Sequence, residues 1–316
     1  MNVIVIFNIH PYFKRRTSIF NRSNKALIKF INTCIAYLLI LPFVLTYGIL
    51  FLWPTIQMVY LSFTDAPLIG PGNWIGLENY IEMFDDRRFW TAVRNTAYFV
   101  ALTVIPNTLI GLAIAMMVSR LKGWQQSIIL AMFFLPYILP VSVVYRIWNW
   151  MFNIQFGILQ YPISAIAGES INVFRTQWLF MPAVAFVTIW WTCGFNILLF
   201  LAGLRSISPD IYEAAALDNA NRWTIFRRIT WPLIWPVTAL VLTIQLILQL
   251  KIFDQVYLFV QGGRPDPSMV MVQYIYSVAF QKNQGGYGAT ISVALFVIVI
   301  VFSILQFQLL RARGEK

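Results

Sequence analysis

The sequence predicts an all-α integral membrane protein with six transmembrane helices. Hydrophobic residues make up 59% of the 316 residues, whereas charged residues make up only 11%. A soluble domain of ordinary composition carries roughly 25% charged residues, so this chain needs lipid as its solvent. A helix needs about 20 apolar residues to cross the hydrocarbon core. Six runs reach that length, near residues 33–53, 93–119, 126–150, 180–204, 236–260 and 289–310.

Several of these runs contain proline, namely Pro42, Pro106, Pro136 and Pro140. Membrane helices tolerate proline because neighbouring groups satisfy the freed backbone carbonyls. We therefore expect each run, including 126–150, to cross the bilayer as one span.

The basic residues predict the orientation of the spans. One side carries most of them: Lys14, Arg15, Arg16, Arg22, Lys25, Lys29, Arg120, Lys122, Arg205, Arg222, Arg227, Arg228, Arg311, Arg313 and Lys316. The other side carries Arg87, Arg88, Arg94, Arg175, Arg264 and Lys282, with Arg146 and Lys251 near span ends. By the positive-inside rule the first side is cytoplasmic. This predicts cytoplasmic tails at 1–32 and 311–316 around a membrane domain at 33–310, and it explains the net charge of +11 without a nucleic-acid partner.

The residues give little support for a disulfide, a metal site or a catalytic site. Cys34 and Cys193 lie inside apolar runs, and His10 is the one histidine, so we expect neither a disulfide nor a metal site, and no catalytic group. The first ten residues are apolar but short, and their positive charges follow them, the reverse of a secretory signal. We interpret them as a cytoplasmic tail or an interfacial helix.

Two loops are expected on the outer side. Residues 62–90 are rich in Gly, Pro and Asn before an amphipathic stretch, which suits either a small external cap or a solvated connector. In the loop 262–288, Gly262, Gly263 and Pro265 indicate a tight turn.

The cytoplasmic loop 205–235 predicts a helix, a turn and a second helix. Ser208 is a suitable N-cap, Pro209 suits the first helical position, and Asp210 lies at the positive end of the helix dipole. The helix would run to Leu217, and Asn219 could adopt the left-handed conformation that ends it.

The second helix of this loop would begin after Asn221, which can cap it, and run to Thr230, where Pro232 would stop it. In the first helix Ala214, Ala215 and Ala216 would leave a smooth surface, and Glu213 lacks a partner one turn further on. Such a surface suits docking into a partner's groove, although a solvated connector helix would look similar.

The stretch EAAALDNANRWTIFRRITWPLIWP (213–236) resembles the EAA loop of the membrane subunits of binding-protein-dependent ABC importers. The matching residues are Glu213, Ala214, Ala215, Asp218, Ala220, Ile229 and Pro232. Asn219 stands where the family usually has glycine, and asparagine is the best substitute for glycine at a positive φ. Residues 74–96, 203–220 and 253–296 are similar to the sugar-permease branch represented by the maltose and glycerol-3-phosphate importers, and the resemblance spans roughly 35–310.

The resemblance implies the type I ABC importer permease fold, in a bacterial plasma (inner) membrane. It implies a coupling helix at 205–235 that is seated in a cytoplasmic ATPase subunit. The sequence has no G-x-x-x-x-G-K-[ST] phosphate loop, so ATP and Mg²⁺ would belong to two partner ATPase subunits and this chain would bind no cofactor. The other implied partners are a second permease subunit, an extracytoplasmic substrate-binding protein, the lipid bilayer and a sugar or sugar derivative.

The substrate path would be lined by the spans on either side of this loop. Thr188, Trp191, Thr192 and Phe195 recur on one helical face, and Asn196 lies beside that face. Gln245 and Gln249 are one turn apart and central in their span. Amides and hydroxyls at that depth face either a cavity or another helix, so both a path and helix packing remain open.

Lys251 and Asp254, three residues apart near the outer end of the fifth run, are expected to form an intramembrane ion pair. Lys251 would instead contact the substrate if that substrate is anionic. The alternative function, an ion-gradient-driven secondary transporter, calls for paired carboxylates or broken helices at mid-membrane. Asp254 is the one acidic residue within the six runs, and it is off-centre.

Overall fold

The computed structural model describes residues 20–260 and 268–314, of which the great majority are helical. The chain divides into two units, residues 1–57 and residues 58–316. Within the described ranges the β-structure is limited to one isolated bridge between Thr64 and Trp74. The all-α prediction is confirmed.

The first unit is a long apolar helix. It consists of α1 (Phe20–Tyr47), a π-helical turn (Gly48–Leu52) and α2 (Trp53–Leu61), which carries the chain into the second unit. Its stretch Phe30–Leu61 is apolar and long enough to cross a membrane.

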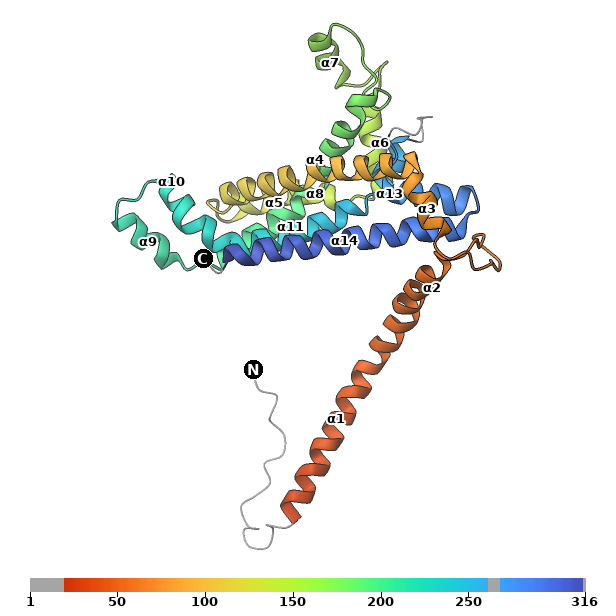
Figure 1. Cartoon of the computed structure of the whole chain (residues 1–316). Helices are drawn as coiled ribbons and strands as arrows, with labels where there is room; N and C mark the ends of the chain where they lie inside the picture. Colours follow the sequence, from red (N-terminus) through yellow and green to blue (C-terminus); the bar gives the residue numbers. More distant parts are fainter. Residues whose placement is uncertain (1–19, 261–267, 315–316) are drawn as a thin grey trace. The chain divides into compact units, whose positions relative to one another are not determined.

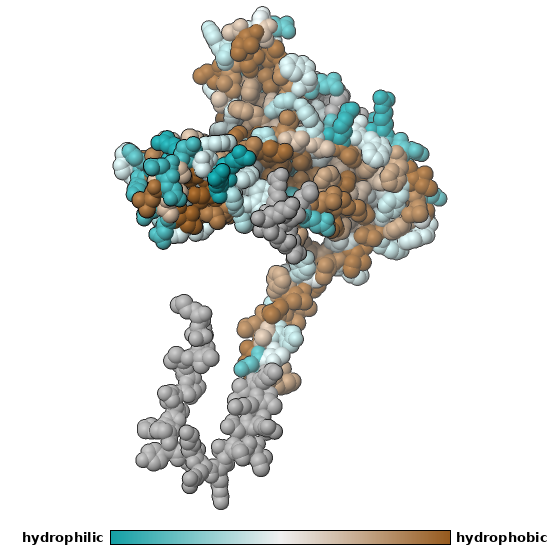
Figure 2. Space-filling model, turned by 60° about the vertical axis from the view of Figure 1, so that its left-hand side comes forward, coloured by the Kyte–Doolittle hydropathy of each residue, from teal (hydrophilic) through white to brown (hydrophobic). Residues whose placement is uncertain are grey.

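The second unit is a bundle of long helices (Figure 1). Four of them confirm the predicted second, fourth and sixth spans and the first part of the fifth: α4 (Arg87–Val118), α8 (Gln177–Arg205), α14 (Gly285–Gly314) and, for the fifth, α11 (Trp231–Leu250). Helix α8 packs against α4, α5 and α11, and α14 packs against α11. Figure 2 shows apolar side chains over much of this unit's visible surface, with hydrophilic ones gathered mainly towards its ends.

The predicted third span is wrong as a single helix. It is broken into α5 (Trp124–Ile138) and α6 (Val141–Met151), whose axes differ by 101°. Leu139 is extended with ψ 136°, because the ring of the following Pro140 excludes the helical conformation. Pro136, by contrast, is accommodated inside α5.

The predicted fifth span also ends too late. Helix α11 stops at Leu250, and after a short irregular segment α12 (Asp254–Val260) begins as a separate helix. Ile252 in this segment is 3% exposed, and it joins a buried core cluster together with Val256 and Phe259. Helix α12 packs against α6 and α8.

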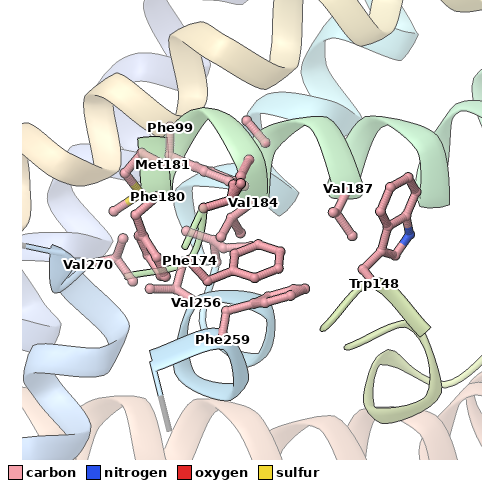
Figure 3. Close-up of a cluster of buried hydrophobic side chains, with 14 of the residues drawn as sticks. Phe99, Trp148, Phe174, Phe180, Met181, Val184, Val187, Val256, Phe259 and Val270 are labelled. Atoms are coloured by element: carbon pink, nitrogen blue, oxygen red, sulfur yellow. The ribbon is translucent and has the colours of Figure 1, made fainter. Parts of the chain in front are cut away.

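This cluster fastens the bent segments to the bundle (Figure 3). It combines Phe99 of α4, Trp148 of α6 and Val184 of α8 with Val256 and Phe259 of α12. Each fully buried aromatic or aliphatic side chain of this kind contributes roughly 1.5–3 kcal/mol relative to its exposed state.

A glycine brings α5 and α8 into direct backbone contact. A Cβ atom on Gly194 of α8 would lie 2.1 Å from the carbonyl oxygen of Phe133 in α5, which no real side chain can occupy. Glycine is therefore required at this crossing for the helices to approach this closely.

The loop 62–90 is a packed cap rather than a solvated connector. Its amphipathic stretch forms α3 (Glu78–Asp85), and Asn79 donates hydrogen bonds to the carbonyls of Ser62 (3.1 Å) and Thr64 (2.8 Å). Met83 packs in a buried cluster with Met271 and Tyr274 of α13 (Met271–Tyr276). Gly262, Gly263 and Pro265, where a tight turn is predicted, lie outside the described residues.

Candidate functional site: an exposed elbow and a buried amide network

The loop between α8 and α11 contains α9 (Pro209–Leu217), as predicted. Ser208 is the N-cap residue, Pro209 lies in the first turn, and Asp210 is the acidic residue there. The Ser208 hydroxyl does not cap the backbone, however, because it donates to the Asp210 carboxylate at 3.2 Å. The helix start is therefore stabilised by the fixed φ of proline and by the charge of Asp210 at the dipole.

The end of α9 follows the sequence closely. Asn219 has φ 53°, the left-handed conformation predicted for it. The amide of Asn219 donates to the Ala216 carbonyl at 3.1 Å, and that of Ala220 donates to the Ala215 carbonyl at 3.0 Å. This pair of bonds is the Schellman motif, which satisfies carbonyls that the helix end leaves free.

The chain then returns to the bundle without a break. The side chain of Asn221 accepts from the Thr224 amide at 2.8 Å and caps α10 (Arg222–Ile225), as predicted. The prediction that Pro232 stops this helix is wrong: a π-helical turn, η2 (Phe226–Thr230), connects α10 directly to α11. In a π turn the hydrogen bonds shift by one residue, so the chain absorbs a proline near the junction and stays helical.

Contacts on both sides hold this loop against the bundle. The hydroxyl groups of Tyr212 in α9 and Thr230 in η2 are hydrogen bonded at 3.3 Å. At the end of α8, Arg205 donates to the side chain of Gln126 in α5, whose amide donates in turn to the Val118 carbonyl at 2.9 Å. We call residues 205–230 the elbow: α9 is held at both ends by spans that pack against each other.

The outer face of the elbow carries an unpaired carboxylate among small residues. Glu213, Ala214 and Ala216 are exposed, and Glu213 has no hydrogen bond or ion pair to any described residue. Ala215 is buried at 6% exposure, so the predicted alanine surface consists of Ala214 and Ala216 only. Leu217 is 85% exposed beside them, and Asp218 and Asn219 are exposed too. An exposed apolar, small-residue face with two carboxylates, Glu213 and Asp218, is a suitable docking surface.

The predicted path residues form a buried amide network near the middle of the bundle. Gln245 of α11 donates to Asn196 of α8 at 2.8 Å, and Gln249 donates to Gln245 at 3.2 Å. Asn107 of α4 donates to Thr192 of α8 at 2.9 Å and to Gln245 at 3.3 Å. Asn196, Gln245 and Gln249 are at most 4% exposed. The network ties α4, α8 and α11 together, which matches the packing interpretation of these side chains.

The other predicted path residues lie around this network. Thr188 is fully buried, and its hydroxyl donates to the Val184 carbonyl of its own helix at 2.8 Å. Trp191, Thr192 and Phe195 are half-buried. Trp191 donates to the Leu139 carbonyl at 3.1 Å, at the break between α5 and α6, and Phe195 stacks on Tyr137 at 5.4 Å between ring centroids. These three side chains and Tyr137 are the ones still accessible from outside the chain.

Sequence reasoning missed Asn107 and Tyr137. Asn107 directly follows Pro106 in the middle of an apolar span, and a lone amide at that depth is a signal that could have been used. Its neighbour Gly111 allows the contact, because a Cβ there would lie 2.8 Å from the Cβ of Asn196.

The predicted ion pair between Lys251 and Asp254 does not form. Lys251 is the C-cap residue of α11, whereas Asp254 begins α12, so the two are not on successive turns of one helix. Both side chains are exposed, and neither has an ionic partner in the described ranges.

A second polar cluster joins the loops at the end of the bundle opposite the elbow. The Asp86 carboxylate caps α4 by accepting from the Arg88 amide at 2.8 Å, and it also accepts from the hydroxyls of Tyr274 and Tyr287, the latter at 2.8 Å. Partial burial raises the pKa of Asp86, but these hydrogen bonds together outweigh it and lower the pKa below its usual value. Burial and the neighbouring Asp86 raise the pKa of Tyr274 far above the ordinary tyrosine value.

Fold and elbow together define a multi-pass membrane protein with an exposed helix suited to docking a partner. The described residues include five helices long and apolar enough to cross a membrane, and the bent α5–α6 pair gives a sixth. Searched over the same residues, His, Cys, Asp and Glu form no group that could hold a metal ion.

Comparison with known proteins identifies the family. Residues 107–314 match the model of the binding-protein-dependent transport system inner membrane component, and the chain belongs to this family. It is 32% identical over 295 residues to the inner membrane ABC transporter permease protein YcjO of Escherichia coli, covering 89% of this chain and 96% of that protein. It is 29% identical over 290 residues to the trehalose/maltose transport system permease protein MalF of Thermococcus litoralis, covering 91% and 97%.

A solved structure supports the fold. A chain of a bacterial ABC transporter involved in the import of the acidic polysaccharide alginate superposes with a TM-score of 0.81 at 22% sequence identity. The superposition covers 91% of this chain and 99% of that one. The protein therefore has the type I ABC importer permease fold and is a permease subunit of a binding-protein-dependent transporter in the membrane.

Proposed function

We propose that this chain forms, with a second permease subunit, the path by which an ATP-driven importer takes up a saccharide or sugar derivative. Two relatives support the substrate class by their names: the trehalose/maltose permease given above, and the arabinooligosaccharides transport system permease protein AraP of Halalkalibacterium halodurans, 31% identical over 292 residues and 91% of this chain. In this proposal the chain is no enzyme. ATP and Mg²⁺ belong to two partner ATPase subunits, and a substrate-binding protein delivers the saccharide.

The observation that carries the proposal is the geometry of the elbow. Glu213 stands exposed on α9, which is joined to α8 by the short segment 206–208 and to α11 through the turn 218–221, α10 and η2. A force applied to α9 by a closing pair of ATPase subunits would therefore move both spans. We assign α9 as the coupling helix, with Glu213, Ala214, Asp218 and Asn219 on or beside the docked face, and Ala215 and Ala220 supporting the turn.

The orientation of the chain follows from its charges. The elbow carries Arg205, Arg222, Arg227 and Arg228, and α4 ends next to Arg120 and Lys122. By the positive-inside rule this end is cytoplasmic, and α14 ends on the same side (Figure 1). Both tails, 1–32 and 311–316, are then cytoplasmic, and the opposite end of the bundle faces the binding protein.

The burial pattern divides the predicted path residues into two groups. Thr188, Asn196, Gln245 and Gln249 are buried inside this chain, where Asn196 and Gln245 link α8 to α11. Trp191, Thr192 and Phe195 remain for the substrate, and together with Tyr137 they form an aromatic surface with a hydroxyl, suited to the C–H face and hydroxyls of a sugar. The second permease subunit would supply the other wall of the path, and it or lipid would cover the exposed first span.

A charge reversal in the elbow tests the coupling role. We expect Glu213→Lys to reduce the ATPase activity stimulated by the binding protein by more than about 30-fold, because an unpaired or repelled charge at a docked interface costs roughly 2–5 kcal/mol. The measurement uses the complete importer in proteoliposomes. The matched control is Glu169→Lys, an equally exposed carboxylate beyond α7 (Gln160–Ala167), which lies far from the elbow in sequence.

For this result to count, the complex that carries Glu213→Lys must still insert into the membrane and fold. Normal uptake by Glu213→Lys would contradict the docking role. Uphill uptake by the purified chain alone, without ATP or other subunits, would contradict the whole proposal and favour the secondary transporter. The saccharide itself is found by measuring which sugar raises the Tm of the cognate binding protein.

A further inference from the structure

A polar cavity lies at the end of the second unit opposite the elbow. Its volume is about 310 Å³, and its walls come from the end of α6 with residues 152–155, from residues 172–175 before α8, and from the end of α12. Helix α8 runs from this cavity to the elbow, and α11 runs back from the elbow towards α12. Under the proposed orientation the cavity therefore opens on the side where a binding protein delivers its cargo.

The floor of the cavity is a set of packed aromatic rings. Phe174 and Phe259 lie 4.3 Å apart between ring centroids, and Phe152 meets Phe174 edge-on at 5.2 Å. Figure 3 shows Phe174 and Phe259 facing each other within the buried cluster. Both are less than 9% exposed, so the floor is rigid and does not collapse into the space above it.

The rim is polar and its amides are held in place. The polar lining residues are Tyr145, Asn149, Asn153, Gln155, Asn172 and Arg175. The side-chain NH₂ of Asn149 donates to the Tyr145 hydroxyl at 2.9 Å. The side-chain oxygen of Asn153 accepts from the backbone N–H of Gln155 at 2.9 Å. The side-chain oxygen of Asn172 likewise accepts from the backbone N–H of Arg175 at 3.1 Å.

One end of each of these amides is therefore fixed by the chain, while the other end has no partner in the described structure. Asn149 leaves its oxygen, and Asn153 and Asn172 leave their NH₂ groups. Gln155 is exposed, and its side chain is bonded to no described residue. The lining therefore offers both acceptors and donors, on asparagine side chains that one hydrogen bond already holds in place, which lowers the entropic cost of binding.

We propose that this cavity binds one ring of a saccharide, as a first contact between the binding protein and the membrane path. The inference rests on the proposed function and assigns its substrate class to a second, outer site. Neighbouring sugar hydroxyls need donors and acceptors side by side, and the C–H face of the ring needs an aromatic floor; the cavity offers both. Its volume is at the lower end for small-molecule sites, and none of the described residues that line it is a carboxylate that could hold a cation.

Cysteine protection tests the assignment directly. In a background with Cys34→Ser and Cys193→Ala, Gln155→Cys is labelled with a maleimide in the complete importer, with and without maltose, trehalose or arabinobiose. We expect one of these sugars to slow the labelling about tenfold at ten times its Kd, because only the unoccupied fraction reacts. The matched control is Tyr161→Cys on α7, which is 87% exposed and does not line the cavity, and its labelling should not change.

Uptake kinetics give a second measurement. Gln155→Ala should raise the KM for the transported saccharide about three- to tenfold, the loss of one uncharged hydrogen bond, with kcat within about twofold. The control Gln177→Ala changes an exposed glutamine outside the cavity and should leave KM unchanged.

The outcomes separate the cavity from the proposed function. Saccharide uptake by the wild-type importer with no protection of Gln155→Cys overturns the cavity assignment alone. Protection by the binding protein without any sugar also overturns it, in favour of a protein contact. Failure to take up any saccharide overturns the proposed function and the cavity with it.

Discussion

The elbow and the amide network both consist of polar residues next to long apolar helices, but they differ in burial and in the origin of their partners. Glu213 in the elbow is exposed and unpaired within the described chain, whereas Gln245 in the network is 1% exposed and bonded to side chains of α4 and α8. An exposed, unpaired charge on a firmly held helix indicates a partner outside the chain. A buried amide with partners inside the chain indicates packing.

Removing one amide of the network should have the largest effect on stability. We expect Asn196→Leu to destabilise the chain by about 1–3 kcal/mol, because the NH₂ group of Gln245 would be left buried without its acceptor. Thermal unfolding of the detergent-solubilised importer measures this loss. Leu198→Ala, on the half-buried side of the same helix, is the control for a change of side chain alone. A smaller loss than in that control would show that the network contributes little to packing.

A change in the turn of the elbow should have a smaller and more local effect. We expect Asn219→Val to destabilise the turn conformation by about 1–2 kcal/mol, because a branched Cβ at φ 53° clashes with the following carbonyl oxygen. Asn219→Gly should be neutral or slightly stabilising at the same position. The measurement is coupling, as uptake per ATP hydrolysed. Equal coupling in the valine and glycine variants would mean that the turn geometry does not matter.

The cluster at Asp86 should show the smallest effect, and one that depends on pH. Its pKa is lowered in the folded chain, so its contribution to stability is present above the unfolded value of 3.8 and is lost as the pH falls through the lower folded value. Because the carboxylate is only partly buried, solvent screening keeps this contribution below about 1 kcal/mol. Below pH 5, the Asp86→Asn variant should lose less stability than the unchanged chain as the pH falls. The Asp85→Asn variant, changed at an exposed neighbour, should lose as much as the unchanged chain. The same dependence of stability on pH in the unchanged chain, in Asp86→Asn and in Asp85→Asn would contradict the role of Asp86.

Part of the elbow could be predicted from the sequence because its determinants are local. Pro209, Asp210, Asn219 and Asn221 act on backbone groups within a few residues of themselves, and the structure places all four as predicted. The network was predicted only in part. Gln245 was singled out by its depth and Asn196 by its place beside a polar and aromatic helical face, but Asn107, from a span more than eighty residues earlier, was not.

By itself the sequence determined the membrane class, the long spans and the cap-and-turn chemistry of the elbow, because hydropathy and helix termini depend on neighbours along the chain. Tertiary structure decided where the chain bends. Pro136 continues a helix and Pro140 breaks one, and α11 stops at Leu250 because Ile252 and Val256 are drawn into a core assembled from α4, α6 and α8. Such choices depend on which distant side chains offer buried apolar surface, and that information appears only when the helices pack.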